Sequence, residues 1–232
     1  MDVWVFGGQK GGVGRTTLSV NLAVAAVKAG LKVAILDLDP NKTGVAWWTH
    51  RFEHLKKGDE PSVAAANYQR LERLLDIARG RGVNLVIIDC PPSFDVILKA
   101  AYEVASLIIL PMRGSEVEAS AFLGDMKHLG DAKEQKKVVL VANAIPTKSP
   151  DASLSVCRMV ADELGIPLLV SHVRNLQSFY RTWTSGRGVV EFGGRDHAEA
   201  ASDVNALYDE LSALRVAVRS RATGRRQAAR VK

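Results

Sequence analysis

The stretch Gln9-Lys10-Gly11-Gly12-Val13-Gly14-Arg15-Thr16-Thr17 decides the fold. It follows a short apolar run at residues 3–6 and precedes residues 16–29, where leucine and alanine recur at helical spacing. The glycines let the backbone turn tightly and aim its N–H groups inward, and the following helix adds its positive N-terminal dipole. The sequence therefore predicts a strand, a phosphate-binding loop and a helix in succession.

This loop departs from the pattern G-x-x-x-x-G-K-[ST] at two positions. Gln9 stands in place of the first glycine and Arg15 in place of the lysine, whereas Thr16 keeps the hydroxyl that binds Mg²⁺ in phosphate loops. A dinucleotide fingerprint is the alternative, but its G-x-G-x-x-G pattern would end on Thr17 instead of glycine. We therefore favour a nucleoside triphosphate with Mg²⁺ as the ligand.

Outside the loop, apolar runs alternate with helical patterns, which predicts an α/β fold with a doubly wound, mostly parallel sheet and helices on both faces. The expected strands cover residues 3–6, 32–36, 63–66, 84–88, 107–110, 138–142 and 168–170. The expected helices cover residues 16–29, 43–57, 68–78, 95–103, 116–129, 151–164, 176–185 and 196–219.

Polar residues stand where several of these strands end. Asp37 and Asp39 follow the second strand, Asp89 ends the fourth, and Asn143 follows the sixth. Ligands of open α/β sheets bind at the carboxyl ends of the strands. Three aspartates beside a phosphate loop therefore indicate Mg²⁺ binding.

The composition of the 232 residues is that of a globular protein, with 47% hydrophobic and 24% charged residues. It excludes a collagen, a wholly disordered chain and a disulfide-rich miniprotein. No apolar run approaches the ~18 residues of a transmembrane helix, and the N-terminus does not resemble a signal peptide. The two cysteines, Cys90 and Cys157, need no bridge, and we expect a cytoplasmic location.

Positive charge is concentrated at the C-terminal end. The net charge is +6 and residues 215–232 contribute +7, so residues 1–214 sum to −1. We expect one domain at residues 1–214 and a basic extension at 215–232 that continues the last helix. The basic residues of the extension are Arg215, Arg219, Arg221, Arg225, Arg226, Arg230 and Lys232.

This basic extension indicates a polyanion partner. Residues 223–232 offer only Val231 as a large apolar residue, so we expect no membrane binding and favour sequence-independent contacts with DNA phosphates. A competing DNA face in the body would use Arg174, Arg181 and Arg187.

Three ordered motifs resemble those of the ParA/MinD family of ATPases. Residues 10–17 resemble the family's deviant Walker A motif, residues 37–41 its switch I motif D-x-D-P-Q, and residues 85–92 its Walker B strand with a D-x-P-P continuation. The chain looks most like the small ParA-type partition proteins that lack an N-terminal helix-turn-helix domain. The resemblance implies that residues 1–214 form a P-loop ATPase domain.

The resemblance implies two catalytic roles. Lys10 is similar to the signature lysine, which reaches the partner's phosphates across a nucleotide-sandwiched dimer, and Asp39 to the residue that orients the attacking water. Backbone donors to the phosphates would come from Gly11, Gly12, Val13, Gly14 and Arg15.

The resemblance also implies ligand contacts. Thr16 would bind Mg²⁺ and Thr17 the α-phosphate of ATP. Asp37 and Asp89 would hold waters bound to the metal. Asn143 resembles an asparagine that reads adenine in this family.

The implied function is that of a ParA-like ATPase, cytoplasmic and associated with the nucleoid, that forms a homodimer with ATP and binds nonspecific DNA. A ParB-like or small adaptor protein would stimulate its slow hydrolysis, and the cargo would be a plasmid, a chromosome or a protein cluster. One alternative is a nucleotide-dependent DNA-binding scaffold with little hydrolysis, because Arg15 replaces the loop lysine. Another is a MinD-like membrane positioning ATPase.

Overall fold

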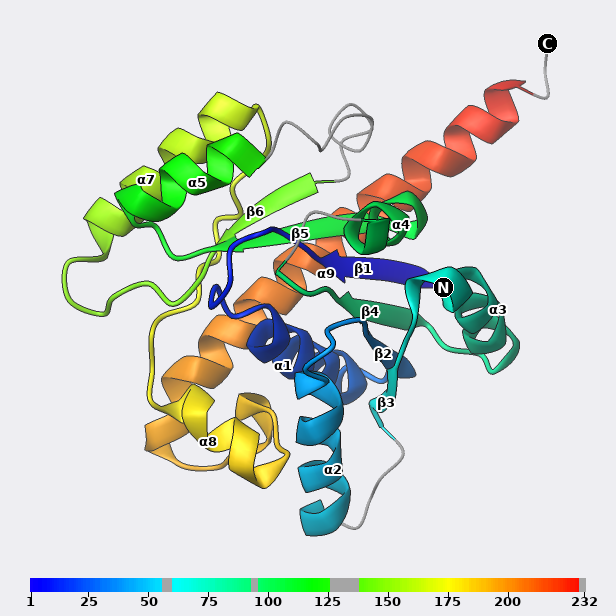
Figure 1. Ribbon diagram of the computed structural model, residues 1–232, viewed down its shortest axis with the longest axis horizontal. Helices are drawn as coiled ribbons and strands as arrows, with labels where there is room; N and C mark the ends of the chain where they lie inside the picture. The colour runs from blue at the N-terminus through cyan, green and yellow to red at the C-terminus, as the bar shows by residue number, and fades with distance from the viewer. Residues whose placement is uncertain (56–59, 93–95, 126–137, 230–232) are drawn as a thin grey trace.

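The computed structural model describes residues 1–55, 60–92, 96–125 and 138–229, and they build a parallel sheet between two layers of helices (Figure 1). The sheet has six strands in the order β3-β2-β4-β1-β5-β6. All the strand pairs are parallel. The strands are β1 (Asp2–Phe6), β2 (Val33–Asp37), β3 (Ser62–Ala65), β4 (Leu85–Asp89), β5 (Leu107–Met112) and β6 (Val138–Ala142).

The connections between strands are helical, as a parallel sheet requires. The α-helices are α1 (Arg15–Lys28), α2 (Thr43–Leu55), α3 (Leu71–Gly80), α4 (Val96–Val104), α5 (Glu116–Asp125), α7 (Pro150–Leu164), α8 (Ser178–Ser185) and α9 (Arg195–Ala229). The described residues also form the short 3-10 helices η1 (Tyr68–Arg70) and η3 (Val189–Glu191).

Alternate residues of β1, β2, β4, β5 and β6 supply two separate cores. In β1, Val3 and Val5 pack on the face covered by α3, α4, α5 and α7. Trp4 and Phe6 pack on the opposite face with residues of α1, α2 and α9. Both faces of these five strands are therefore buried, which is why they read as continuous apolar runs, whereas the edge strand β3 is mostly exposed.

The expected doubly wound fold is confirmed, with differences at a few elements. Residues 168–170 are not a strand: the structure has a single isolated bridge there, between Leu140 and Leu168. The helix expected at 68–78 starts as the 3-10 helix η1, and α9 continues to Ala229 instead of ending at residue 219. The end of the helix expected at 116–129 lies outside the described residues.

The register brings the strand-end aspartates together. Asp37 pairs with Asp89 across β2 and β4, and Asp89 pairs with Phe6 of β1. The loop at residues 7–14 connects the carboxyl end of β1 to α1. The N-terminus of α1 therefore lies at the same end of the parallel strands as these two carboxylates. Among the described helices, none is long and apolar enough to cross a membrane.

Candidate functional site

The N-terminus of α1 is open to an anion. The helix begins after Gly14, whose φ of 89° lies in the left-handed region, and no side chain caps it. Its first backbone bond runs from the Leu18 N–H to the Gly14 carbonyl, and the N–H groups before Leu18 have no partner within the helix. These donors and the helix dipole favour a phosphate at this position.

Arg15 is buried and its guanidinium is held by the protein itself. Its Nε donates to the Cys90 carbonyl at 3.1 Å, and its Nη1 donates to the carbonyls of Gly8 and Lys10, both at 2.8 Å. Burial lowers the pKa of Arg15, and the charge of Asp89 opposes this effect. Arg15 therefore connects the loop to the chain that leaves β4.

Asp89 is a fully buried carboxylate with an unsatisfied oxygen. Its Oδ1 accepts a 3.5 Å hydrogen bond from Ser19, whereas its Oδ2 has no partner among the described residues. Burial raises the pKa of Asp89 to about 7, against the effect of the Thr16 hydroxyl. A divalent cation prefers oxygen ligands and would satisfy this oxygen, so Asp89 and Thr16 fit the expected Mg²⁺.

Asp37 organises the turn that follows β2. Its Oδ1 accepts from the Asp39 N–H at 3.0 Å and its Oδ2 from the Val45 N–H at 3.1 Å. Asp37 therefore caps the first turn of α2, a role that we did not predict from the sequence. Burial raises the pKa of this carboxyl group.

Asp39 and Lys10 keep accessible side chains beside the loop. Asp39 is half-buried, and its Oδ1 accepts from the Asn41 N–H at 2.8 Å. Lys10 is exposed, while its carbonyl is held by Arg15. Exposure of the Lys10 side chain is compatible with a contact to a second molecule.

Asn143 lies against the loop and lines a cavity of about 180 Å³. Its Nδ2 donates to the Val13 carbonyl at 2.6 Å. Its Oδ1 is the acceptor that Asn143 offers to the amino group of an adenine. The lining residues include Gly12, Gly14, Thr17, Arg113, Asn143, Phe179 and Tyr180.

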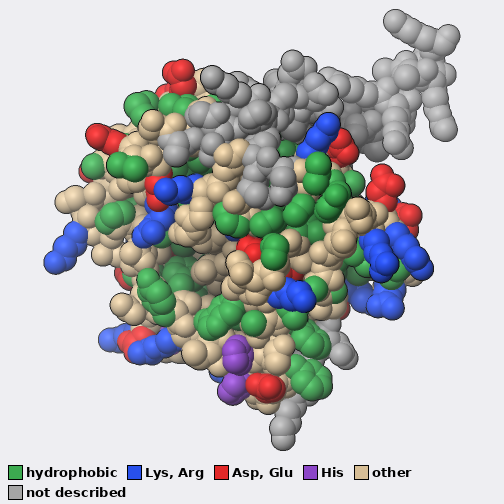
Figure 2. Space-filling view, viewed as in Figure 1, with side chains coloured by type: hydrophobic (Ala, Val, Ile, Leu, Met, Phe, Trp, Pro, Cys, Tyr) green, Lys and Arg blue, Asp and Glu red, His purple; other side chains and the backbone are tan. Residues whose placement is uncertain are grey.

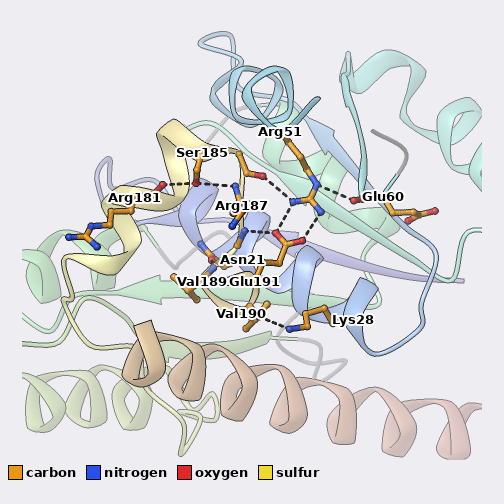
Figure 3. Close-up of polar contacts among 12 residues, drawn as sticks. Asn21, Lys28, Arg51, Glu60, Arg181, Ser185, Arg187, Val189, Val190 and Glu191 are labelled. Carbon is orange, nitrogen blue, oxygen red and sulfur yellow. Dashed lines mark hydrogen bonds and ion pairs between the residues drawn. The ribbon is translucent and has the colours of Figure 1, made fainter. Parts of the chain in front are cut away.

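An ion pair between a buried arginine and a partly buried glutamate positions α2, the helix that follows the Asp37 turn (Figure 3). Arg51 of α2 donates from Nη1 and Nη2 to the two carboxylate oxygens of Glu191 at 2.7 and 2.8 Å. It also donates to the carbonyls of Glu60 and Gly186. Burial raises the pKa of Glu191, but hydrogen bonds from Arg51 and the Gly188 N–H outweigh it and the net pKa is lowered.

The same segment is held from α1. Asn21 accepts from the Val189 N–H at 2.7 Å and donates to the Thr17 carbonyl at 2.8 Å. Lys28 donates to the Val190 carbonyl at 2.5 Å (Figure 3). Residues 188–191 therefore connect the phosphate-loop helix to α2. We did not predict these contacts from the sequence, because their partners lie far apart in the chain.

Of the three basic candidates in the body, Arg174 is the one paired with acidic side chains. Arg174 forms ion pairs with Asp203 and Glu199, and Arg187 lies over the Phe192 ring, whereas Arg181 is exposed. Acidic and basic side chains are interspersed over the face shown in Figure 2. Most of the basic extension lies in α9, of which the structure describes only the backbone from Arg215 onward. Residues 230–232 lie outside the described residues.

Comparison with known proteins identifies a family. The family model described as "CobQ/CobB/MinD/ParA nucleotide binding domain" matches residues 4–189. A relative from Gloeobacter kilaueensis, named "Maintenance of carboxysome distribution protein A", is 27% identical over 203 residues, which cover 87% of this chain and 90% of that protein.

Solved structures share the fold. The MinC:MinD cell division protein complex of Aquifex aeolicus aligns with a TM-score of 0.73 and 17% identity over 92% of this chain and 96% of that one. Cobyrinic acid a,c-diamide synthase from Mycobacterium smegmatis, with a bound ATP analogue and magnesium, aligns with a TM-score of 0.67 and 21% identity over 91% of this chain and 94% of that one.

We predict that Glu191→Gln destabilises the protein by about 3 kcal/mol, because it leaves the buried Arg51 charge without its partner. The pKa of Glu191 is lowered from its ordinary 4.5, so the pair stabilises the fold above that pH and loses its effect as the pH falls through the lowered pKa. Urea unfolding at several pH values measures this contribution.

Asp76→Asn is the matched control, since it breaks the exposed Asp76–Arg79 pair and should cost less than about 1 kcal/mol. Equal losses in the two variants would contradict a structural role for the Arg51–Glu191 pair.

Proposed function

The chain belongs to the CobQ/CobB/MinD/ParA family of nucleotide-binding domains, and on that premise we propose that it is a ParA-like positioning ATPase. It binds ATP with Mg²⁺, forms a homodimer around the nucleotide and binds DNA without sequence preference. The observation that carries the nucleotide site is the uncapped N-terminus of α1 at the same sheet edge as Asp89, whose Oδ2 is buried without a partner among the described residues.

In this proposal each part of the site has one task. The backbone of residues 11–15 binds the phosphates, Thr17 contacts the α-phosphate, and Thr16 with Asp89 holds the cation, with Asp37 placing one of its waters. The ion would supply positive charge that screens the phosphate oxygens during hydrolysis. Asp39 is accessible and orients the attacking water.

For the cargo we propose a protein assembly. The relative named for maintenance of carboxysome distribution matches along 87% of this chain, which supports positioning of a protein cluster over partition of a plasmid or a chromosome. An adaptor protein on the cargo would stimulate hydrolysis. A scaffold with little turnover is the second candidate, supported by the buried Arg15 at the position of the family's lysine.

The proposed dimer predicts a specific defect for Lys10→Ala. Lys10 is exposed and would meet the partner's phosphates, so its loss should weaken ATP-dependent dimerisation by about 10-fold or more. Binding of ATP to the monomer should change less. Light scattering after size exclusion, with ATP and Mg²⁺, measures the dimer fraction.

Lys32→Ala is the control, because Lys32 is also exposed but precedes β2, at the opposite end of the parallel strands. ATP-driven dimers of Lys10→Ala that form as readily as those of the wild type would remove Lys10 from the interface.

The basic extension is the DNA-binding element that we propose. Residues 1–214 carry a net charge of −1, and Arg174, one of the candidates in the body, is already paired with acids. A dimer brings two extensions onto one duplex, so DNA binding should depend on ATP through avidity.

Deletion of residues 219–232 should abolish most DNA affinity and leave ATP binding unchanged. The log–log salt dependence of the intact protein should have a slope near −0.9 per phosphate contacted, and scrambled duplexes should bind equally. Mobility-shift titrations at one salt concentration compare the truncated protein and the scrambled duplexes with the wild type, and repeating them at several salt concentrations gives the slope.

A variant with lysine at all the basic positions of residues 219–232 keeps the charge and should bind DNA. If the truncated protein binds DNA as tightly as the full chain, the DNA-binding face lies in the body.

A further inference from the structure

Arg15 makes contacts that span the two sides of the phosphate loop. Gly8 and Lys10, which accept from its Nη1, lie on the limb that leaves β1. Cys90, which accepts from its Nε, follows the last residue of β4. The loop and the end of the neighbouring strand are therefore joined through one side chain.

A lysine at this position could not reproduce the arrangement. Arginine offers five N–H donors in a rigid planar fork, whereas lysine has one nitrogen at the end of a flexible stem. The contacts of Arg15 use two different nitrogens that point to different parts of the backbone. Its third nitrogen, Nη2, forms no hydrogen bond within the described part of the chain.

The surroundings of Arg15 are well suited to its positive charge. Arg15 is only 7% exposed, and the carboxylates of Asp89 and Asp39 lie near enough to stabilise its positive charge. Hydrogen bonds from a charged donor to a carbonyl are stronger than neutral ones, and burial excludes the water that would compete for them.

We propose that Arg15 is a positioning residue that anchors the phosphate loop to the end of β4 before the nucleotide arrives, and that its Nη2, which has no partner among the described residues, then meets a phosphate oxygen. This proposal rests on the proposed nucleotide site. It implies that the loop is organised around arginine, so that restoring the family's lysine weakens ATP binding instead of improving it.

Amide hydrogen exchange without nucleotide tests the anchor. Arg15→Lys should speed exchange in the peptide that covers residues 8–14 by about 10-fold or more, because at least one charge-assisted hydrogen bond is lost. Exchange in α3 and α7 should not change. Arg73→Lys is the matched control, since Arg73 is exposed on α3.

Steady-state phosphate release gives a readout that a general loss of structure would not produce. Arg15→Lys should raise the KM for ATP by about 10-fold, because the loop is no longer anchored before ATP binds. It should not lower kcat, because lysine still reaches a phosphate once ATP has ordered the loop. Arg15→Gln, which lacks the charge, should raise KM and lower kcat.

Unchanged loop exchange in Arg15→Lys, or a KM equal to or below that of the wild type, would overturn the proposal. If neither protein hydrolyses ATP, the proposed function fails as an ATPase, while the exchange experiment still decides whether Arg15 anchors the loop.

Discussion

The N-terminus of α1 is the constraint on which the rest of the structure depends. A helix that starts after a left-handed glycine without a side-chain cap leaves its first N–H groups for a ligand. Around it, Arg15 holds the loop from the side of β4 and Asn143 holds the Val13 carbonyl from the side of β6. The open donors are therefore presented by a loop whose carbonyl groups at Gly8, Lys10 and Val13 are already bound.

The same helix is connected to the Asp37 turn by contacts distant in sequence. Asn21 binds the segment at residues 188–191, and Glu191 of that segment binds Arg51 of α2. Asp37 in turn caps α2. The Asp37 turn and the phosphate-loop helix are therefore joined by a continuous set of hydrogen-bonded groups.

The sequence predicted the sheet well, because strands buried on both faces read as apolar runs such as residues 85–89. It failed at residues 168–170, where an apolar run forms only an isolated bridge. It also placed Asp37 and Asp89 at one edge correctly, since parallel strands align their carboxyl ends. It could not reveal the Arg51–Glu191 pair, because partners 140 residues apart leave no local pattern.

Calorimetric titration of ATP at several Mg²⁺ concentrations tests the central claim most directly: the nucleotide binds at the N-terminus of α1 with its cation at Asp89. We predict one nucleotide per chain in the wild type, with an affinity that rises with Mg²⁺, and loss of that Mg²⁺ dependence in Asp89→Asn. The absence of saturable binding to the wild type, or an equal Mg²⁺ dependence in the variant, would contradict the account.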